Sequence, residues 1–147
     1  MPTSFELTPM MMREIIMEHY SNPSHKHVPT SDGYTSIHTD STNCIDNFDI
    51  YIKCENGKIV DALWDGVACT ISSASTDILC DRMIGSSYKD AIYTIEQYQK
   101  MIQLQEYDAS VLDEAIVFIN TGKQAARIHC ATMGWDAMKE LIKKEGE

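Results

Sequence analysis

Positive charge is scarce in this sequence of 147 residues. The 12 lysines and arginines are outnumbered by 22 aspartates and glutamates, which gives a formal net charge of -10 at pH 7. The densest basic cluster consists only of Lys139, Lys143 and Lys144. A phosphate backbone would be repelled by this charge, and no basic stripe compensates for it locally. The composition therefore predicts no nucleic-acid partner.

Long apolar runs are also missing. Residues 1–20 lack the basic start and the continuous apolar stretch of a secretory signal peptide, and no run approaches the length of a membrane span. We therefore expect a cytoplasmic protein with no membrane partner.

The five cysteines are an odd number and include no Cys-x-x-Cys pair. This pattern argues against a disulfide framework and favours reduced thiols.

The first half of the chain carries the periodicity of one helix followed by strands. Thr8-Pro9 and Asn22-Pro23 are typical of the two ends of a helix. A short strand is predicted at 34–39, and alternating apolar residues predict a second strand at 48–53. Asn56-Gly57 is typical of a tight type I′ turn, after which Val60, Ala62 and Trp64 are expected on one face of a returning strand.

The second half of the chain has helical periodicity. After Cys69 the apolar spacing predicts four helices: one ending at Gly85, one beginning at Ser86 or Ser87, one from Ser110 to about Gly122, and a final helix around Trp135. Strands followed by helices indicate an α+β fold, with a small three-stranded antiparallel sheet packed against about five helices. Residues 1–147 are predicted to form one domain with a single core. The polar segment 24–33 is predicted to be an exposed loop without a role in the fold, and His25, His27 and His38 to be solvated.

Four dispersed residues offer the ligand set of a borderline or soft metal: Cys44, Asp46, Cys69 and Cys130. Cys44 and Asp46 lie two residues apart, so their side chains leave an extended backbone on the same face. Cys69 and Cys130 are expected at or near helix N-termini, where the helix dipole lowers the pKa of a thiol. The spacing alone leaves open whether these residues form a site or pack as small hydrophobic side chains.

The remaining cysteines and one histidine are weaker candidates. Cys54 and Cys80 are predicted to be packing residues, and Cys80 lies about 16 Å along the helix from Cys69. His129 precedes Cys130 and is a candidate further ligand or proton carrier. It is otherwise a surface residue, because adjacent helix positions point in different directions.

Three blocks of sequence closely resemble the three cysteine blocks of the U-type iron–sulfur cluster assembly proteins, the family of IscU, SufU and the N-terminal domain of NifU. The blocks are Asn43-Cys44-Ile45-Asp46, Trp64-Asp65-Gly66-Val67-Ala68-Cys69-Thr70-Ile71-Ser72-Ser73-Ala74-Ser75 and Arg127-Ile128-His129-Cys130-Ala131-Thr132-Met133-Gly134-Trp135. The opening helix, ending Tyr20-Ser21-Asn22-Pro23, extends the resemblance over nearly the whole chain. The resemblance implies an α+β fold of the SufE/NifU-like kind.

The long stretch between Cys69 and Cys130 is more similar to the SufU branch than to the shorter IscU branch. The SufU resemblance implies that Zn²⁺ is bound by Cys44, Asp46, Cys69 and Cys130. It also implies sulfur transfer from a PLP-dependent, SufS-like cysteine desulfurase, with Cys44 as the persulfide acceptor after its release from the metal. Other cluster-assembly proteins are implied as further partners, and the chain would be a sulfur carrier of the sulfurtransferase kind at most.

The IscU resemblance implies an alternative, in which the same positions hold a [2Fe-2S] cluster or iron. Cys130 is then the expected sulfur acceptor and His129 an accessory ligand, because a histidine directly before the last cysteine is typical of that branch.

Ile45 replaces the glycine usual between the first cysteine and the aspartate. Lys123-Gln124-Ala125-Ala126-Arg127 replaces the Leu-Pro-Pro-Val-Lys segment through which the scaffold branch docks its Hsp70 chaperone, so we do not expect that docking. A purely structural zinc site is a third hypothesis.

Overall fold

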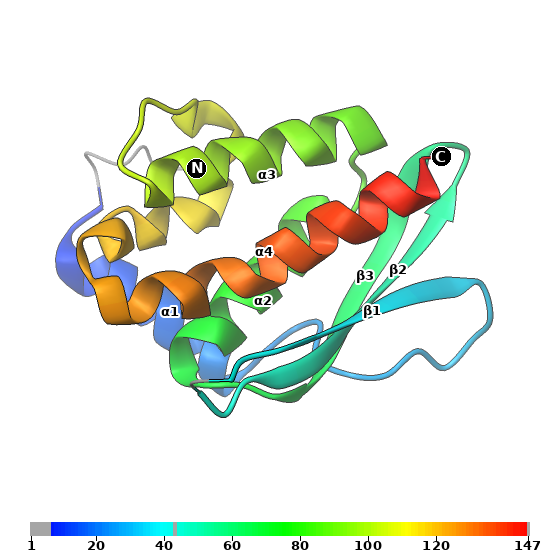
Figure 1. Ribbon diagram of the computed structural model, residues 1–147, viewed down its shortest axis with the longest axis horizontal. Coiled ribbons are helices and arrows are strands. Elements are labelled where there is room, and N and C mark those ends of the chain that lie inside the picture. The colour runs from blue at the N-terminus through cyan, green and yellow to red at the C-terminus, as the bar shows by residue number, and fades with distance from the viewer. Residues whose placement is uncertain (1–6, 43, 147) are drawn as a thin grey trace.

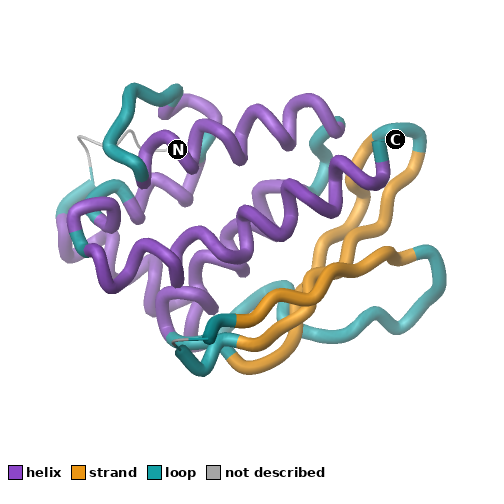
Figure 2. The backbone as a smooth tube through the Cα atoms, viewed as in Figure 1, coloured by secondary structure: helices purple, strands orange, loops and turns teal. Residues whose placement is uncertain are grey.

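The sheet and the helices occupy separate parts of the molecule (Figure 1). The computed structural model describes residues 7–42 and 44–146. An antiparallel sheet in the order β1-β2-β3 is formed by β1 (Tyr34–Asp40), β2 (Asn47–Glu55) and β3 (Lys58–Val67). To one side of this sheet lie α1 (Pro9–Ser21), α2 (Thr70–Met83), α3 (Tyr88–Ile102) and α4 (Ala125–Glu145), as Figures 1 and 2 show. The predicted α+β fold with a three-stranded antiparallel sheet is confirmed.

The β2–β3 hairpin forms as its sequence predicts. Asn56 and Gly57 both have positive φ, 52° and 76°, as a type I′ turn requires. Ala62 and Trp64 are buried as expected, but Val60 is 40% exposed and Ile59 takes the inward position. The pairing of β2 with β3 shifts register between Lys53 and Cys54. Such an irregularity reverses which side chains face the core, so the prediction that Val60 shares one face with Ala62 and Trp64 was wrong.

Side-chain caps place two of the helix starts where the sequence predicts them. The Thr8 hydroxyl accepts a hydrogen bond from the Met11 N–H at 3.1 Å, and the Ser87 hydroxyl accepts one from the Asp90 N–H at 3.1 Å. These contacts satisfy backbone donors that have no partner inside the helix. The starts of α1 and α3 can therefore be located from their capping residues alone.

The helix predicted over 110–122 is instead a run of 3₁₀ turns. The run comprises η2 (Ala109–Val111), η3 (Asp113–Phe118) and η4 (Thr121–Lys123). Asp113 has a φ of 48°, which interrupts helical geometry, and the cap is supplied by Asp108 instead of Ser110. Leu112, Ala115 and Ile116 remain buried, so the apolar spacing predicted the inward face correctly but not the type of helix.

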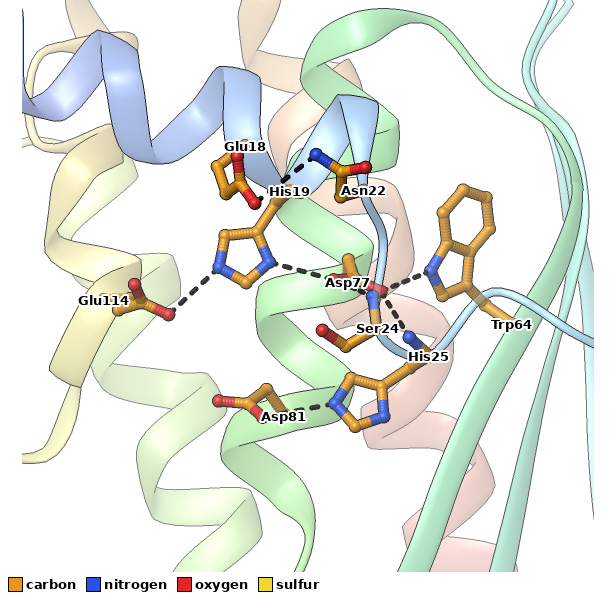
Figure 3. Close-up of polar contacts among 9 residues, drawn as sticks. All are labelled: Glu18, His19, Asn22, Ser24, His25, Trp64, Asp77, Asp81 and Glu114. Atoms are coloured by element: carbon orange, nitrogen blue, oxygen red, sulfur yellow. Dashed lines mark hydrogen bonds and ion pairs between the residues drawn. The ribbon is translucent and has the colours of Figure 1, made fainter.

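The buried carboxylate of Asp77 on α2 joins α1, the segment after it and the sheet (Figure 3). Its oxygens accept hydrogen bonds from His19 Nδ1 at 2.8 Å, from the Ser24 and His25 N–H groups, and from Trp64 Nε1 at 3.2 Å. Burial alone would raise the pKa of Asp77, but these donors hold it below the usual value. The ring of His19 also contacts Glu114 at 3.0 Å.

The segment 24–33 therefore contributes contacts to the fold, and the prediction that it is a loop without such a role was wrong. Besides the two contacts with Asp77, the Trp64 N–H donates to the His25 carbonyl at 3.0 Å, and His25 Nε2 contacts Asp81 at 3.1 Å. The side chain of His25 is only 15% exposed, so its predicted solvation was wrong. These contacts link residues more than 35 positions apart, which a local pattern does not reveal.

The helices of the described residues have no segment that combines the length and the apolar character needed to cross a bilayer. Their apolar side chains instead form the core with the inner face of the sheet, where Phe48, Ile50 and Ile52 are buried.

The contacts of His19 make stability depend on pH. The hydrogen bond to Asp77 raises the pKa of His19 to about 9 from 6.5, with burial opposing it and Glu114 adding to it. A raised folded-state pKa gives stability that is fully present below about pH 6.5 and lost as the pH rises through about 9. We expect His19→Gln to lower the free energy of unfolding by about 2 kcal/mol at pH 6, and by less at pH 10, in urea titrations.

The matched control is His27→Gln, because the exposed ring of His27 contacts only the Val28 carbonyl among the described residues. This variant should follow the wild-type pH profile. An effect of His19→Gln that stays constant from pH 6 to pH 10 would contradict the assignment.

Candidate metal centre

Four side chains that are distant in the sequence meet at one end of the sheet. Cys44 and Asp46 lie in the loop between β1 and β2, Cys69 lies between β3 and α2, and Cys130 lies on α4. The antiparallel pairing of Asn47 with Val67 brings the first loop beside the second. One ligand atom from each of the four residues lies within 4.8 Å of all the others. The fold therefore brings the four candidate ligands together, and their binding of a metal stays a prediction.

The size and chemistry of this group fit a metal of the zinc type. A tetrahedral shell with metal–sulfur bonds of about 2.3 Å has sulfur–sulfur edges of roughly 3.8 Å. The observed spread of up to 4.8 Å thus lies about 1 Å above the size of such a shell. Three thiols and one carboxylate also match the donors that zinc and iron prefer.

Two hydrogen bonds, one to each oxygen, hold the Asp46 carboxylate. It is 1% exposed, and its Oδ1 accepts a hydrogen bond from the Cys69 N–H at 2.7 Å. Its Oδ2 accepts one from the Ser72 hydroxyl at 2.7 Å. Each carboxylate oxygen retains a further lone pair, so the hydrogen bonds orient the group without preventing it from binding a metal.

Ser72 is the residue of this site that the sequence analysis missed. It lies in the first turn of α2, fully buried, with its hydroxyl 2.7 Å from Asp46 and 3.0 Å from the Cys130 carbonyl. It therefore lies between two of the ligand-bearing segments. The only sequence signal was its position three residues after Cys69, because the N-cap and the third helical position face the same end of the helix.

Cys69 occupies the place that the sequence predicts. It is the N-cap of α2, and its Sγ accepts from the Ser72 N–H at 3.5 Å. The thiol therefore lies at the positive end of the helix dipole.

Cys130 lies in the second turn of α4 and not at its start, because the helix begins at Ala125. The predicted lowering of its pKa by the helix N-terminus was therefore wrong. Burial raises the pKa of Cys130 to about 12, with further contributions from the hydrogen bond with Cys69 and from the charges of Asp46 and Cys44. The neighbouring negative charges thus disfavour the ionised form of the Cys130 thiol. A bound cation would reverse this effect on the pKa.

The weaker candidates lie outside the group. His129 is exposed on α4, and its ring is not among the ligand atoms that come together in the described residues. Cys80 is fully buried on α2, as a packing residue should be. Cys54 is half-buried on β2, where burial raises its pKa.

Comparisons of the sequence with known proteins show similarity to one family model and to named members of that family. Residues 11–145 match the family model described as the NifU-like N terminal domain. The chain is 32% identical over 138 residues to the zinc-dependent sulfurtransferase SufU of Bacillus subtilis, covering 92% of this chain and 91% of that protein. It is also 32% identical over 131 residues to the iron–sulfur cluster assembly scaffold protein IscU of Streptococcus pyogenes, covering 88% and 81%.

A solved structure extends the similarity to the fold. The crystal structure of a hypothetical protein has a TM-score of 0.84 and 31% identity, and the match covers 92% of this chain and 99% of that one. The resemblance inferred from the three cysteine blocks is thereby confirmed.

Ser72→Ala tests whether the hydroxyl orients Asp46. We expect the affinity for Zn²⁺, measured by competition with a chromogenic chelator, to fall by about tenfold or more, because the loss of a hydrogen bond to a metal ligand has an effect of this size. Ser73→Ala is the matched control, since among the described residues the Ser73 hydroxyl on the same helix donates only to the Ala68 carbonyl. Equal affinities of the two variants would argue against an orienting role.

Proposed function

The chain belongs to the NifU-like N-terminal domain family, and on that basis we propose that it is an iron–sulfur cluster assembly protein that binds zinc and accepts sulfur. The donor is a PLP-dependent cysteine desulfurase of the SufS kind, and other cluster-assembly proteins receive the sulfur in the cytoplasm. The observation that carries the proposal is the group of three thiols and one carboxylate within 4.8 Å. The similarity to a protein named zinc-dependent sulfurtransferase supports it.

Cys44, Asp46, Cys69 and Cys130 hold the metal in this proposal. Zinc has no redox chemistry, and when bound it keeps the thiols deprotonated at neutral pH. Asp46 in place of a fourth thiolate makes the ligand set less soft. The hydrogen bonds from the Cys69 N–H and the Ser72 hydroxyl keep its carboxylate in position.

Cys44 is the proposed sulfur acceptor because it is the exposed thiol of the group, whereas Cys69 and Cys130 are half-buried. Its thiolate attacks the outer sulfur of the persulfide on the donor's cysteine. A new S–S bond forms at Cys44, the S–S bond of the donor breaks, and the donor leaves as a thiolate. No net oxidation or reduction occurs, so the transfer requires no further reactant.

A scaffold function is the second candidate. The similarity to a protein named as an iron–sulfur cluster assembly scaffold supports it, and the same donor set suits a [2Fe-2S] cluster or iron. Cys130 would then be the acceptor and His129 an accessory ligand. Anaerobic reconstitution with iron and sulfide separates the two candidates. A stoichiometric, visible-absorbing cluster that transfers to an apo-protein favours the scaffold, and retained zinc without a stable cluster favours the sulfur acceptor.

Alanine substitution of Cys44, Cys69 or Cys130 should abolish stimulation of the cysteine desulfurase. Each variant removes a thiolate that the proposal requires for metal binding or for sulfur acceptance. Desulfurase turnover with cysteine as substrate is the measurement, and mass spectrometry of the zinc-loaded wild type should find one added sulfur atom at Cys44.

Cys54→Ala is the control, because this half-buried thiol lies outside the group and should not be needed for stimulation. Stimulation retained by all three site variants would refute sulfur acceptance at this centre. Zinc bound without any persulfide after incubation with desulfurase and cysteine would favour a purely structural metal site.

A further inference from the structure

An apolar groove beside the metal centre is lined by α1, the first turn of α2 and the residues leading into α4. Its volume is about 320 Å³. Met12, Ile16, Ile71 and Val117 supply apolar surface. None of the residues of α1 is fully buried, and Met17 is 43% exposed at the same groove. The apolar side chains that α1 presents to the groove are thus not covered by the rest of the protein.

Two arginines at this groove are without ionic partners. The chain contains only three arginines. Arg82 donates to the Val111 carbonyl and pairs with Asp113, whereas Arg13 and Arg127 form no hydrogen bond or ion pair through their side chains in the described part of the chain. Both line the groove, and no aspartate or glutamate among the described residues lines it with them. In a chain of net charge -10, this concentration of unpaired positive charge is a local exception.

The groove adjoins the thiols. Thr70 and Ile71 line it and directly follow Cys69. Arg127 lies three residues before Cys130 on α4, so the two side chains share one face of the helix. Ile45, between Cys44 and Asp46, is 64% exposed, and Val67, two residues before Cys69, is 57% exposed. Exposed apolar side chains therefore occur both in the groove and next to the ligands.

We propose that this groove docks a segment of the sulfur-donating cysteine desulfurase in which carboxylates alternate with apolar side chains. This inference rests on the proposed function and adds the docking surface and its chemistry. Carboxylates pair with Arg13 and Arg127, and apolar side chains cover Ile16, Ile71 and the exposed part of Met17. A donor held there brings its persulfide to the end of the sheet where Cys44 lies.

A second copy of this chain is a poorer occupant of the groove. Each copy carries a net charge of -10, so the overall electrostatic interaction between two copies is repulsive. A donor protein needs only a local acidic segment to match the two arginines, and buried arginine contacts are prominent among the residues that dominate protein–protein affinity.

The test compares charge reversals at two grooves. Arg13→Glu/Arg127→Glu alters the proposed site. Lys89→Glu/Lys143→Glu makes the same change in net charge at an apolar groove near the other end of α4, about 24 Å along the helix from Arg127. Arg13→Lys/Arg127→Lys keeps the charge. All proteins are zinc-loaded, with thermal unfolding and zinc content compared first, and are titrated calorimetrically into the cysteine desulfurase of the same organism.

We expect the dissociation constant of Arg13→Glu/Arg127→Glu to rise by at least about tenfold. The lysine pair at the proposed site should retain most of the affinity, and the distant reversal should stay within about twofold of the wild type. Equal weakening by the two reversals would overturn the proposal, because net charge alone would then explain it. Unchanged binding by Arg13→Glu/Arg127→Glu would overturn it as well.

Three outcomes distinguish this inference from the proposed function and from a contact between two copies. Wild-type protein that does not bind the desulfurase refutes the partnership itself, and the groove proposal falls with it. Wild-type protein that binds while Arg13→Glu/Arg127→Glu binds equally well leaves sulfur acceptance intact and refutes only the groove. A wild-type dimer that this variant converts to monomer in sedimentation, with desulfurase binding unchanged, would assign the groove to a second copy.

Discussion

The burial of polar side chains on α2 is the constraint on which the rest of the structure depends. Ten of the 14 residues of this helix are buried, and five of them are polar. A buried polar group is costly unless it forms hydrogen bonds. Ser72 therefore bonds to Asp46, Ser75 to the Ala131 carbonyl and Trp135 Nε1, and Asp77 to groups from α1, the segment after it and β3. Each neighbour of α2 is thus fixed in position by a polar side chain that α2 supplies.

The close approach of α4 depends on another buried polar residue of α2, Thr76, whose hydroxyl has no hydrogen-bond partner among the described residues. Gly134 lies against Thr76, where a Cβ atom would be only 2.6 Å from the Thr76 hydroxyl oxygen, so a residue without a side chain is required. Trp135 then lies stacked on Tyr98 of α3, with ring centroids 3.7 Å apart. This packing fixes α4 along its length and thereby sets the position of Cys130 one turn before Gly134. The geometry of the candidate metal centre is in this sense a consequence of how small polar residues pack between helices.

The sequence alone predicts the parts of this protein that depend on local signals. The alternation of apolar and polar residues predicted β2, and the Asn56-Gly57 pair predicted the hairpin. Capping residues predicted where α1 and α3 begin. The start of α4 was misplaced because Gln124 makes no side-chain capping hydrogen bond, so no local signal marks it. The run of 3₁₀ turns depends on the positive φ of Asp113, and the roles of Ser72 and the 24–33 segment depend on contacts between distant residues. The four candidate ligands were identified from their restrictive residue types, although only the fold brings them together.

The four candidate ligands differ in how firmly the fold holds them. Asp46 is fixed by the Cys69 N–H and the Ser72 hydroxyl, Cys69 caps α2, and Cys130 lies within the hydrogen-bonded backbone of α4. Cys44 lies in a connecting loop and is exposed, next to an Ile45 that is 64% exposed. A centre that accepts sulfur needs one thiolate that can reach a donor while the other ligands keep their arrangement. The division between three supported ligands and one exposed thiol matches that requirement, and it argues for Cys44 in preference to Cys130 as the sulfur acceptor.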